Sequence, residues 1–117
     1  MIQMRFIGER RPVARITMIV TDGDRGVKRQ TMPFVASSKV RHEPVYSRLG
    51  FDWGEDNAST VELARAILRR VYPGGYTHVL NDAMYKRFAA EVVAKLPRDA
   101  FEMTDATVQA WVGGQVR

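Results

Sequence analysis

The chain has no cysteine, and this absence excludes disulfides, thiolate metal sites and cysteine nucleophiles together. Histidine is almost as scarce. Only His42 and His78 are present, and two histidines so far apart in the sequence are poor material for a zinc or iron site. We therefore expect no metal and no cofactor, and a fold that rests on packing.

Long hydrophobic runs are also missing. Residues 18–20 form an apolar triplet, far short of the roughly 20 residues that cross a bilayer. The first residues lack the basic and then apolar pattern of a signal peptide. The 117 residues are 45% hydrophobic and 26% charged, which is typical of a globular protein. We expect a cytoplasmic protein with no membrane partner, in which residues 1–117 form one domain.

The first third of the chain alternates apolar and polar residues, which is the pattern of half-buried strands. The alternation covers residues 2–6 and 14–21. Asp22-Gly23 follows and predicts a hairpin turn, with a third strand resuming over residues 27–34. Pro33 cannot donate a hydrogen bond to a neighbouring strand, so this third strand should lie at an edge or end there.

Helical spacing begins after an irregular stretch over residues 35–57, which is either a binding loop or a structural wrap. Ser59 and Glu62 fit a capping box at the start of a helix with an apolar stripe over residues 61–71. On this interpretation Glu62 and Arg65 belong to the solvated side of the helix.

Two further helices are expected. One begins near Thr77 or Asn81 and runs to Leu96, where Pro97 ends it. The other is capped by Thr104 and closed by residues 113–114, both glycine. Strands followed by helices indicate an α+β fold, with a small antiparallel N-terminal sheet of about three strands packed against about three C-terminal helices.

The net charge of +5 is concentrated in the first half, where residues 1–50 hold ten basic and four acidic side chains. The candidate basic patch consists of residues from the expected hairpin and its approach: Arg10, Arg11, Arg15, Arg25, Lys28 and Arg29. We expect Arg15 and Arg29 to be neighbours, with Arg25 at the tip. Such a patch can bind phosphates or an acidic protein surface, or it can keep a sheet edge soluble.

Two aromatic residues, Phe51 and Trp53, stand near the end of the irregular stretch. They are either a platform on which a partner stacks or an anchor for the loop. The neighbouring acids Glu55 and Asp56 suit helix capping or acid–base catalysis. No nucleophile or base accompanies them, so we expect the protein not to be an enzyme.

Four short motifs follow one another along the chain. They are Phe51-Asp52-Trp53-Gly54, the Leu-Ala-Arg-Ala-Ile-Leu segment over 63–68, the Val-Val-Ala-Lys-Leu-Pro segment over 92–97, and Trp111. In these the chain resembles a small bacterial and bacteriophage domain family of unknown function. Residues 55–60 replace the Gly-Ser-Gly-Pro-like turn usual in that family. The resemblance implies a shared fold and a home in bacteria or their mobile elements, and it implies no chemistry.

These observations predict a non-enzymatic interaction module that binds a macromolecular partner, in the first place a protein complex. One setting is a phage- or mobile-element-encoded accessory protein or an inhibitor of a host defence complex. A nucleic-acid-binding protein that uses the basic hairpin is the alternative. A third hypothesis is an enzyme with a site near Trp53.

Overall fold

The computed structural model describes residues 2–10, 13–34, 44–73 and 80–115. Its contacts divide the chain into two compact units. The sheet unit consists of Met1–Met32 with Asp99–Arg117, and the helical unit consists of Pro33–Arg98. That residues 1–117 fold as one domain stays a prediction.

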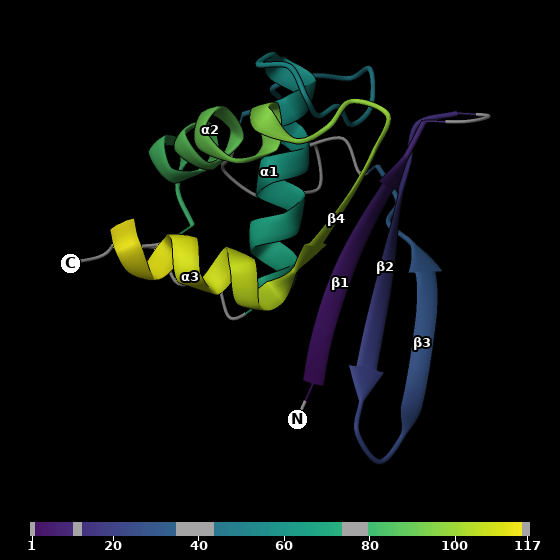
Figure 1. Cartoon of the computed structure of the whole chain (residues 1–117). Helices are drawn as coiled ribbons and strands as arrows, with labels where there is room; N and C mark the ends of the chain where they lie inside the picture. Colours follow the sequence, from purple (N-terminus) through teal and green to yellow (C-terminus); the bar gives the residue numbers. More distant parts are fainter. Residues whose placement is uncertain (1, 11–12, 35–43, 74–79, 116–117) are drawn as a thin grey trace. The chain divides into compact units, whose positions relative to one another are not determined.

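The sheet unit contains four antiparallel strands in the order β3-β2-β1-β4 (Figure 1). The strands are β1 (Ile2–Glu9), β2 (Arg15–Asp22), β3 (Gly26–Thr31) and β4 (Ala100–Thr104). The predicted antiparallel sheet and the α+β class are confirmed. The fourth strand was not predicted, because its five residues are a short signal and form a strand only when β1 offers its edge for pairing.

One face of the sheet is apolar and buried. Its members come from three strands and follow the two-residue period of each: Phe6, Ile16, Met18, Phe101 and Met103. The apolar pattern continues toward the hairpin end, where Ile2 is 56% exposed. The strands therefore extend beyond the part of the sheet that is buried.

Gly8 allows β1 and β4 to pack closely. It lies directly opposite Phe101 in the pairing of these strands. A Cβ atom at this position would be only 2.1 Å from Cε2 of the Phe101 ring. The ring therefore occupies the space that any other residue would need for its side chain.

The expected hairpin turn joins β2 to β3. The Arg25 amide donates to the Asp22 carbonyl over 2.9 Å, and Gly26 has φ of +88°. Glycine adopts this left-handed backbone without the steric cost that a side chain would bring. The Asp-Gly signal thus predicted the turn correctly.

Helix α3 (Asp105–Gln115) follows β4 without a break and contacts both β1 and β4. The predicted cap is confirmed, because Thr104 Oγ1 accepts a hydrogen bond of 3.2 Å from the Thr107 amide. The prediction that two glycines close this helix is wrong. The helix continues through Gly113 and Gly114, since glycine weakens a helix without ending it where the backbone stays right-handed.

The helical unit contains α1 (Ala58–Val71), α2 (Asp82–Glu91) and the short 3-10 helix η2 (Val93–Lys95). Helix α1 is capped by Asn57, whose side chain accepts from the Thr60 amide over 3.0 Å, so the predicted Ser59 capping box is wrong. Asn81 caps α2 in the same way. The predicted single helix to Leu96 instead ends at Glu91 and continues as η2.

The polar side predicted for α1 is not solvated. Every residue from Thr60 to Arg65 is buried, including Glu62 and Arg65. The apolar stripe at Ala64, Ile67 and Leu68 is confirmed. The prediction fails for the other side of the helix because periodicity along a helix cannot tell whether a distant segment covers its charged face.

We expect Gly8→Ala to destabilise the protein by about 1–3 kcal/mol, because the added methyl group must displace the Phe101 ring. Chemical denaturation monitored by circular dichroism measures this free energy of unfolding. Gly113→Ala is the matched control. It adds the same group in open space on α3 and should stabilise by about 0.5–1 kcal/mol. Equal effects of the two substitutions would contradict the close contact at Gly8.

Candidate interaction surface

Strand β3 forms one edge of the sheet, and all six of its residues are exposed. Among residues 2–10, 13–34, 44–73 and 80–115, no strand pairs with its outer side. The edge carries Lys28 and Arg29, and the turn before it carries Arg25. We call these three residues the hairpin cluster.

The strand register places Lys28 opposite Val20 and Arg29 opposite Ile19. Neighbouring residues of a strand point to opposite faces, so the two basic side chains flank the edge from both sides. Neither they nor Arg25 form an ion pair within the part of the chain that the structure describes.

The candidate basic patch does not form one surface. Arg15 pairs with Glu9 at the end of the sheet that is remote from the hairpin turn. Ile19, the partner of Arg29, lies four residues further along β2, about 13 Å away at the rise of a strand. The prediction that Arg15 and Arg29 are neighbours is therefore wrong.

The other two residues of the candidate basic patch are Arg10 and Arg11. Arg10 lies at the same remote end, beside a shallow hollow that is also lined by Glu9, Asp99 and Ala100. Arg11 lies outside the described residues. The basic residues near the turn and those at the remote end therefore belong to separate surfaces.

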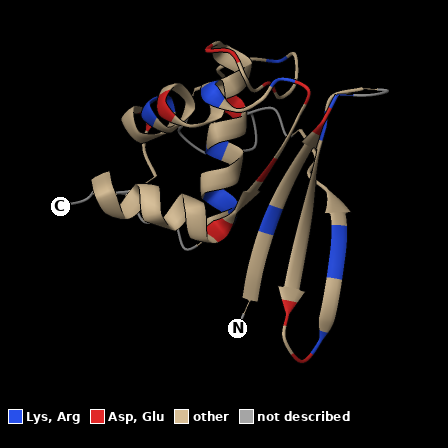
Figure 2. Ribbon diagram, in the orientation of Figure 1, with Lys and Arg blue, Asp and Glu red and all other residues tan. Residues whose placement is uncertain are grey.

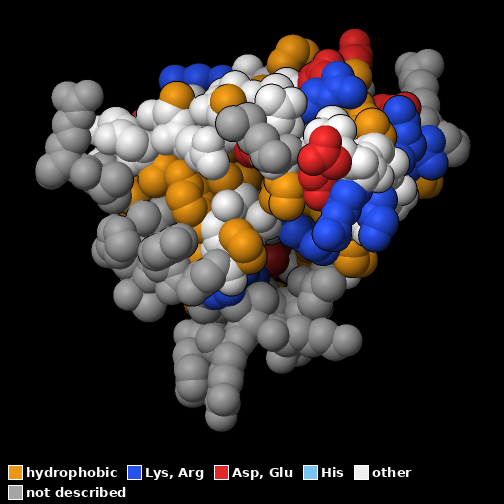
Figure 3. Space-filling model, turned by 90° about the horizontal axis from the view of Figure 1, so that it is seen from below, with side chains coloured by type: hydrophobic (Ala, Val, Ile, Leu, Met, Phe, Trp, Pro, Cys, Tyr) orange, Lys and Arg blue, Asp and Glu red, His pale blue; other side chains and the backbone are white. Residues whose placement is uncertain are grey.

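The hairpin turn is not purely basic. Asp22 and Asp24 both precede Arg25 at the turn, and Figure 2 shows both signs of charge there. Figure 3, which looks at the molecule from below, also shows basic and acidic side chains interspersed. On β1, Arg5 is paired with Glu102 over 2.8 Å, so that charge is already neutralised. The three residues of the hairpin cluster form no ion pair with described residues, and the same is true of Arg15 at the remote end of the sheet.

The aromatic pair is split between two environments. Trp53 has no exposed surface, so its ring is not presented for stacking and the residue acts as an anchor. Phe51 is half-buried and meets Phe34 edge to face, with ring centroids 5.2 Å apart. Together they hold the segment before α1 in place.

The acids near Trp53 are surface residues. Glu55 and Asp56 are both exposed, and Glu55 forms an ion pair of 2.9 Å with Arg98. The main-chain carbonyl of Glu55 also accepts a hydrogen bond from Thr60 at the start of α1. This arrangement supports a structural use of the acids rather than acid–base catalysis.

A buried charged network, absent from the sequence expectations, holds the segment before α1 against the helices. Glu62 and Arg65 have side chains only 3% exposed and lie 2.8 Å apart. The other carboxylate oxygen of Glu62 accepts from the amides of Tyr46, at 2.7 Å, and Ser47, at 3.1 Å. Arg65 donates to the Pro44 carbonyl over 2.9 Å.

Aromatic rings complete the network. The Arg65 guanidinium lies 4.7 Å from the ring centroid of Tyr46 and 5.9 Å from that of Tyr85. Such contacts stabilise a desolvated cation. In the sequence, an acid and a base three residues apart look like an ordinary solvated pair, so no local signal distinguishes this one. The Glu62 carboxylate and the Arg65 guanidinium both have hydrogen-bond partners in this network, which supports a structural role in holding the segment.

The Tyr46 hydroxyl donates a hydrogen bond to Asp82 at the start of α2. This hydrogen bond, followed by that from Lys86, lowers the pKa of the Asp82 carboxyl below its ordinary value of 3.8. The ionised carboxylate is therefore favoured by folding. Its contribution to stability is present above the ordinary pKa and is lost as the pH falls through the lowered pKa.

We expect Arg65→Met to cost about 3–5 kcal/mol of unfolding free energy, because it leaves the Glu62 carboxylate buried without its cation. The double variant Glu62→Leu with Arg65→Met should cost less than this single one. Lys86→Met, on an exposed pair, should change stability by less than about 0.5 kcal/mol. Urea denaturation measures all three, and a double variant worse than the single one would contradict the burial argument.

We expect Tyr46→Phe to raise the pKa of the Asp82 carboxyl toward its ordinary value, because the largest cause of the shift is removed. Carbon-detected NMR of side-chain carboxyls during a pH titration measures this directly. Lys86→Met should raise the same pKa, because it removes the second cause. An Asp82 titration unchanged in Tyr46→Phe would show that the hydroxyl does not hold the carboxylate.

In the described part of the chain, no helix is long and apolar enough to span a membrane. Within the same ranges, no three His, Asp or Glu side chains are grouped so that they can hold a metal ion. Both histidines lie outside the described residues. The expected absence of a metal and a cofactor therefore stays a prediction.

Comparison with known proteins identifies the family. No curated protein and no solved structure matches the chain. The model of a family of unknown function, DUF6166, matches residues 7–114. This range includes all of β2, β3, β4, α1, α2 and η2, the last three residues of β1, and α3 up to Gly114. The chain belongs to the DUF6166 family, which confirms the resemblance to a small domain family of unknown function.

Proposed function

We propose that this protein is a non-enzymatic module that binds a protein partner through the edge of the β2–β3 hairpin. One observation carries the proposal: β3 is a fully exposed edge strand with basic side chains on both of its faces. An exposed strand offers main-chain donors and acceptors that a protein partner can use. The hairpin cluster adds charge that selects among partners.

Nucleic-acid binding is the second candidate, and the geometry of the hairpin favours it less. A nucleic acid, whether bound through a groove or through its phosphate backbone, contacts several basic side chains that lie on one face of the protein. Lys28 and Arg29 point to opposite faces, and Arg10 and Arg15 are at the other end of the sheet. Asp22 and Asp24 would repel phosphates at the tip.

An enzyme near Trp53 has the least support, because the ring is buried and the neighbouring acids are exposed. A role as a phage- or mobile-element-encoded accessory protein, or as an inhibitor of a host defence complex, stays a prediction. Neither the hairpin nor the buried network bears on the source of the chain.

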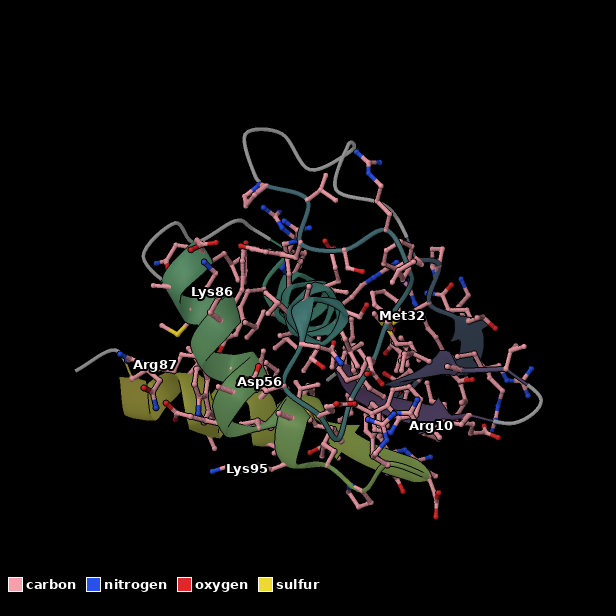
Figure 4. All side chains as sticks on the ribbon, turned by 90° about the horizontal axis from the view of Figure 1, so that it is seen from above. Arg10, Met32, Asp56, Lys86, Arg87 and Lys95 are labelled. Carbon is pink, nitrogen blue, oxygen red and sulfur yellow. The ribbon has the colours of Figure 1, made fainter. Side chains whose placement is uncertain are left out.

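The test is quantitative capture of bacterial proteins by the tagged chain, with nuclease present throughout. We expect the variant Lys28→Glu with Arg29→Glu to reduce the capture of specific partners about tenfold or more, because reversed charges repel an acidic surface. The chain supplies a matched control. Lys86 and Arg87 form the same Lys-Arg pair on α2 (Figure 4), and their side chains are 60% and 55% exposed.

Charge reversal at Lys86 and Arg87 should leave capture unchanged. If both double variants capture the same proteins as the unmodified chain, the hairpin is not the binding surface and the proposal fails. Partners that disappear on nuclease treatment would favour the nucleic-acid alternative, whose binding should also weaken steeply with salt.

A further inference from the structure

We infer that the partner supplies an acidic, extended segment that adds to the outer side of β3 as a fifth strand. This inference rests on the proposed function and names the partner's chemistry and its mode of binding.

The direction of the main-chain groups follows from one hydrogen bond. The Met32 amide donates to the Ile16 carbonyl over 2.8 Å, just beyond the last paired residues of β3. Amides in an antiparallel strand alternate between the two sides. Lys28 and Gln30 therefore share the inward direction of Met32, and their main-chain groups bind β2.

The same alternation directs the main-chain N–H and C=O groups of Val27, Arg29 and Thr31 outward. Three outward-facing residues at every second position are enough for a short added strand to form a regular series of main-chain hydrogen bonds. Within the described ranges no strand takes these positions.

The side chains specify what the added strand should carry. Residues on an added strand become cross-strand neighbours of Lys28 on one face and of Arg29 on the other. Two adjacent carboxylates in the partner satisfy both, since adjacent residues of a strand also point to opposite faces. No acidic residue occurs between Arg25 and Phe34, so the partner's carboxylates should lie along β3 itself, away from Asp22 and Asp24 in the turn.

An apolar side chain in the partner also has a place to bind. A hollow of about 190 Å³ lies on the Lys28 face of the hairpin, with Ile2 and Val20 as its apolar walls. Lys28, Arg25, Gly26 and the acidic Asp22 also line it. The apolar walls favour an apolar residue in the bound segment, and the acidic residues of that segment should lie toward Lys28, away from Asp22 at the turn.

The charges of the edge argue against a second copy of this chain as the occupant. An antiparallel pairing of two β3 edges would bring Lys28 and Arg29 of each copy close to those of the other. Like charges facing each other across strands destabilise the pairing. The same charges attract an acidic segment, so the edge discriminates between the two occupants.

The direct experiment is amide hydrogen exchange followed by NMR. The probe is a capped eight-residue peptide with two adjacent central glutamates flanked by valine and threonine. At saturating peptide we expect exchange at the amides of Val27, Arg29 and Thr31 to slow by about tenfold or more, because they become hydrogen-bonded. The amides of Lys28 and Gln30 bind β2 already and should change less.

A peptide with two lysines in place of the glutamates should not bind. The variant Lys28→Glu with Arg29→Glu should reverse this preference. Thr31→Pro removes an outward N–H without removing a bond to β2, and Pro is tolerated at such edge positions. It should weaken binding of the glutamate peptide about tenfold, whereas Thr31→Val, which keeps the N–H, should not. Circular dichroism confirms that each variant is folded.

The outcomes separate the two proposals. If capture of bacterial proteins depends on Lys28 and Arg29 but Thr31→Pro leaves it intact, the hairpin binds proteins through its side chains and strand addition is wrong. Failure of both peptides to bind also overturns strand addition, as does protection of the outward amides by self-association measured in the ultracentrifuge. Protection by a DNA duplex in place of the peptide would overturn it as well. Capture that is insensitive to charge reversal overturns the proposed function itself.

Discussion

The alternation of side chains and main-chain groups along paired strands is the constraint on which the sheet unit depends. It places Phe6, Met18 and Met103 on one face, and it aligns Gly8 with Phe101 so that the ring fills the space above the glycine. It also separates Lys28 from Arg29. A patch that looks continuous in the sequence is therefore divided between faces and between ends of the sheet, and the surface that remains is an edge rather than a basic face.

In the helical unit, a buried ion pair has the corresponding role. Taking Glu62 and Arg65 out of water is costly, and the cost is offset only because main-chain amides, a carbonyl and two aromatic rings complete their interactions. Those partners come mostly from residues 44–47, far from α1 in the sequence. The pair therefore does more than stabilise a helix, since it determines where an irregular segment lies.

Local signals predicted the parts of the fold that depend on local chemistry. The Asp-Gly turn, the cap at Thr104 and the buried stripe at Ile67 and Leu68 each involve residues a few positions apart. Some errors have a different cause. Strand β4, the burial of Glu62 and Arg65, and the distance between Arg15 and Arg29 depend on pairing or cover by distant segments. The cap at Ser59 and the end of α3 at its two glycines were wrong predictions from local signals.

The sequence by itself determined the fold class, the hairpin, the helices and the basic character of the first half, because periodicity, turn chemistry and composition act over short ranges. Only the tertiary structure decided which charges are exposed. In helix α1 the acid–base pair Glu62 and Arg65 is buried, whereas the two basic residues Lys28 and Arg29 of the hairpin are exposed. The physical reason is that burial depends on what covers a residue, and the covering segment is remote in the sequence and invisible to local patterns.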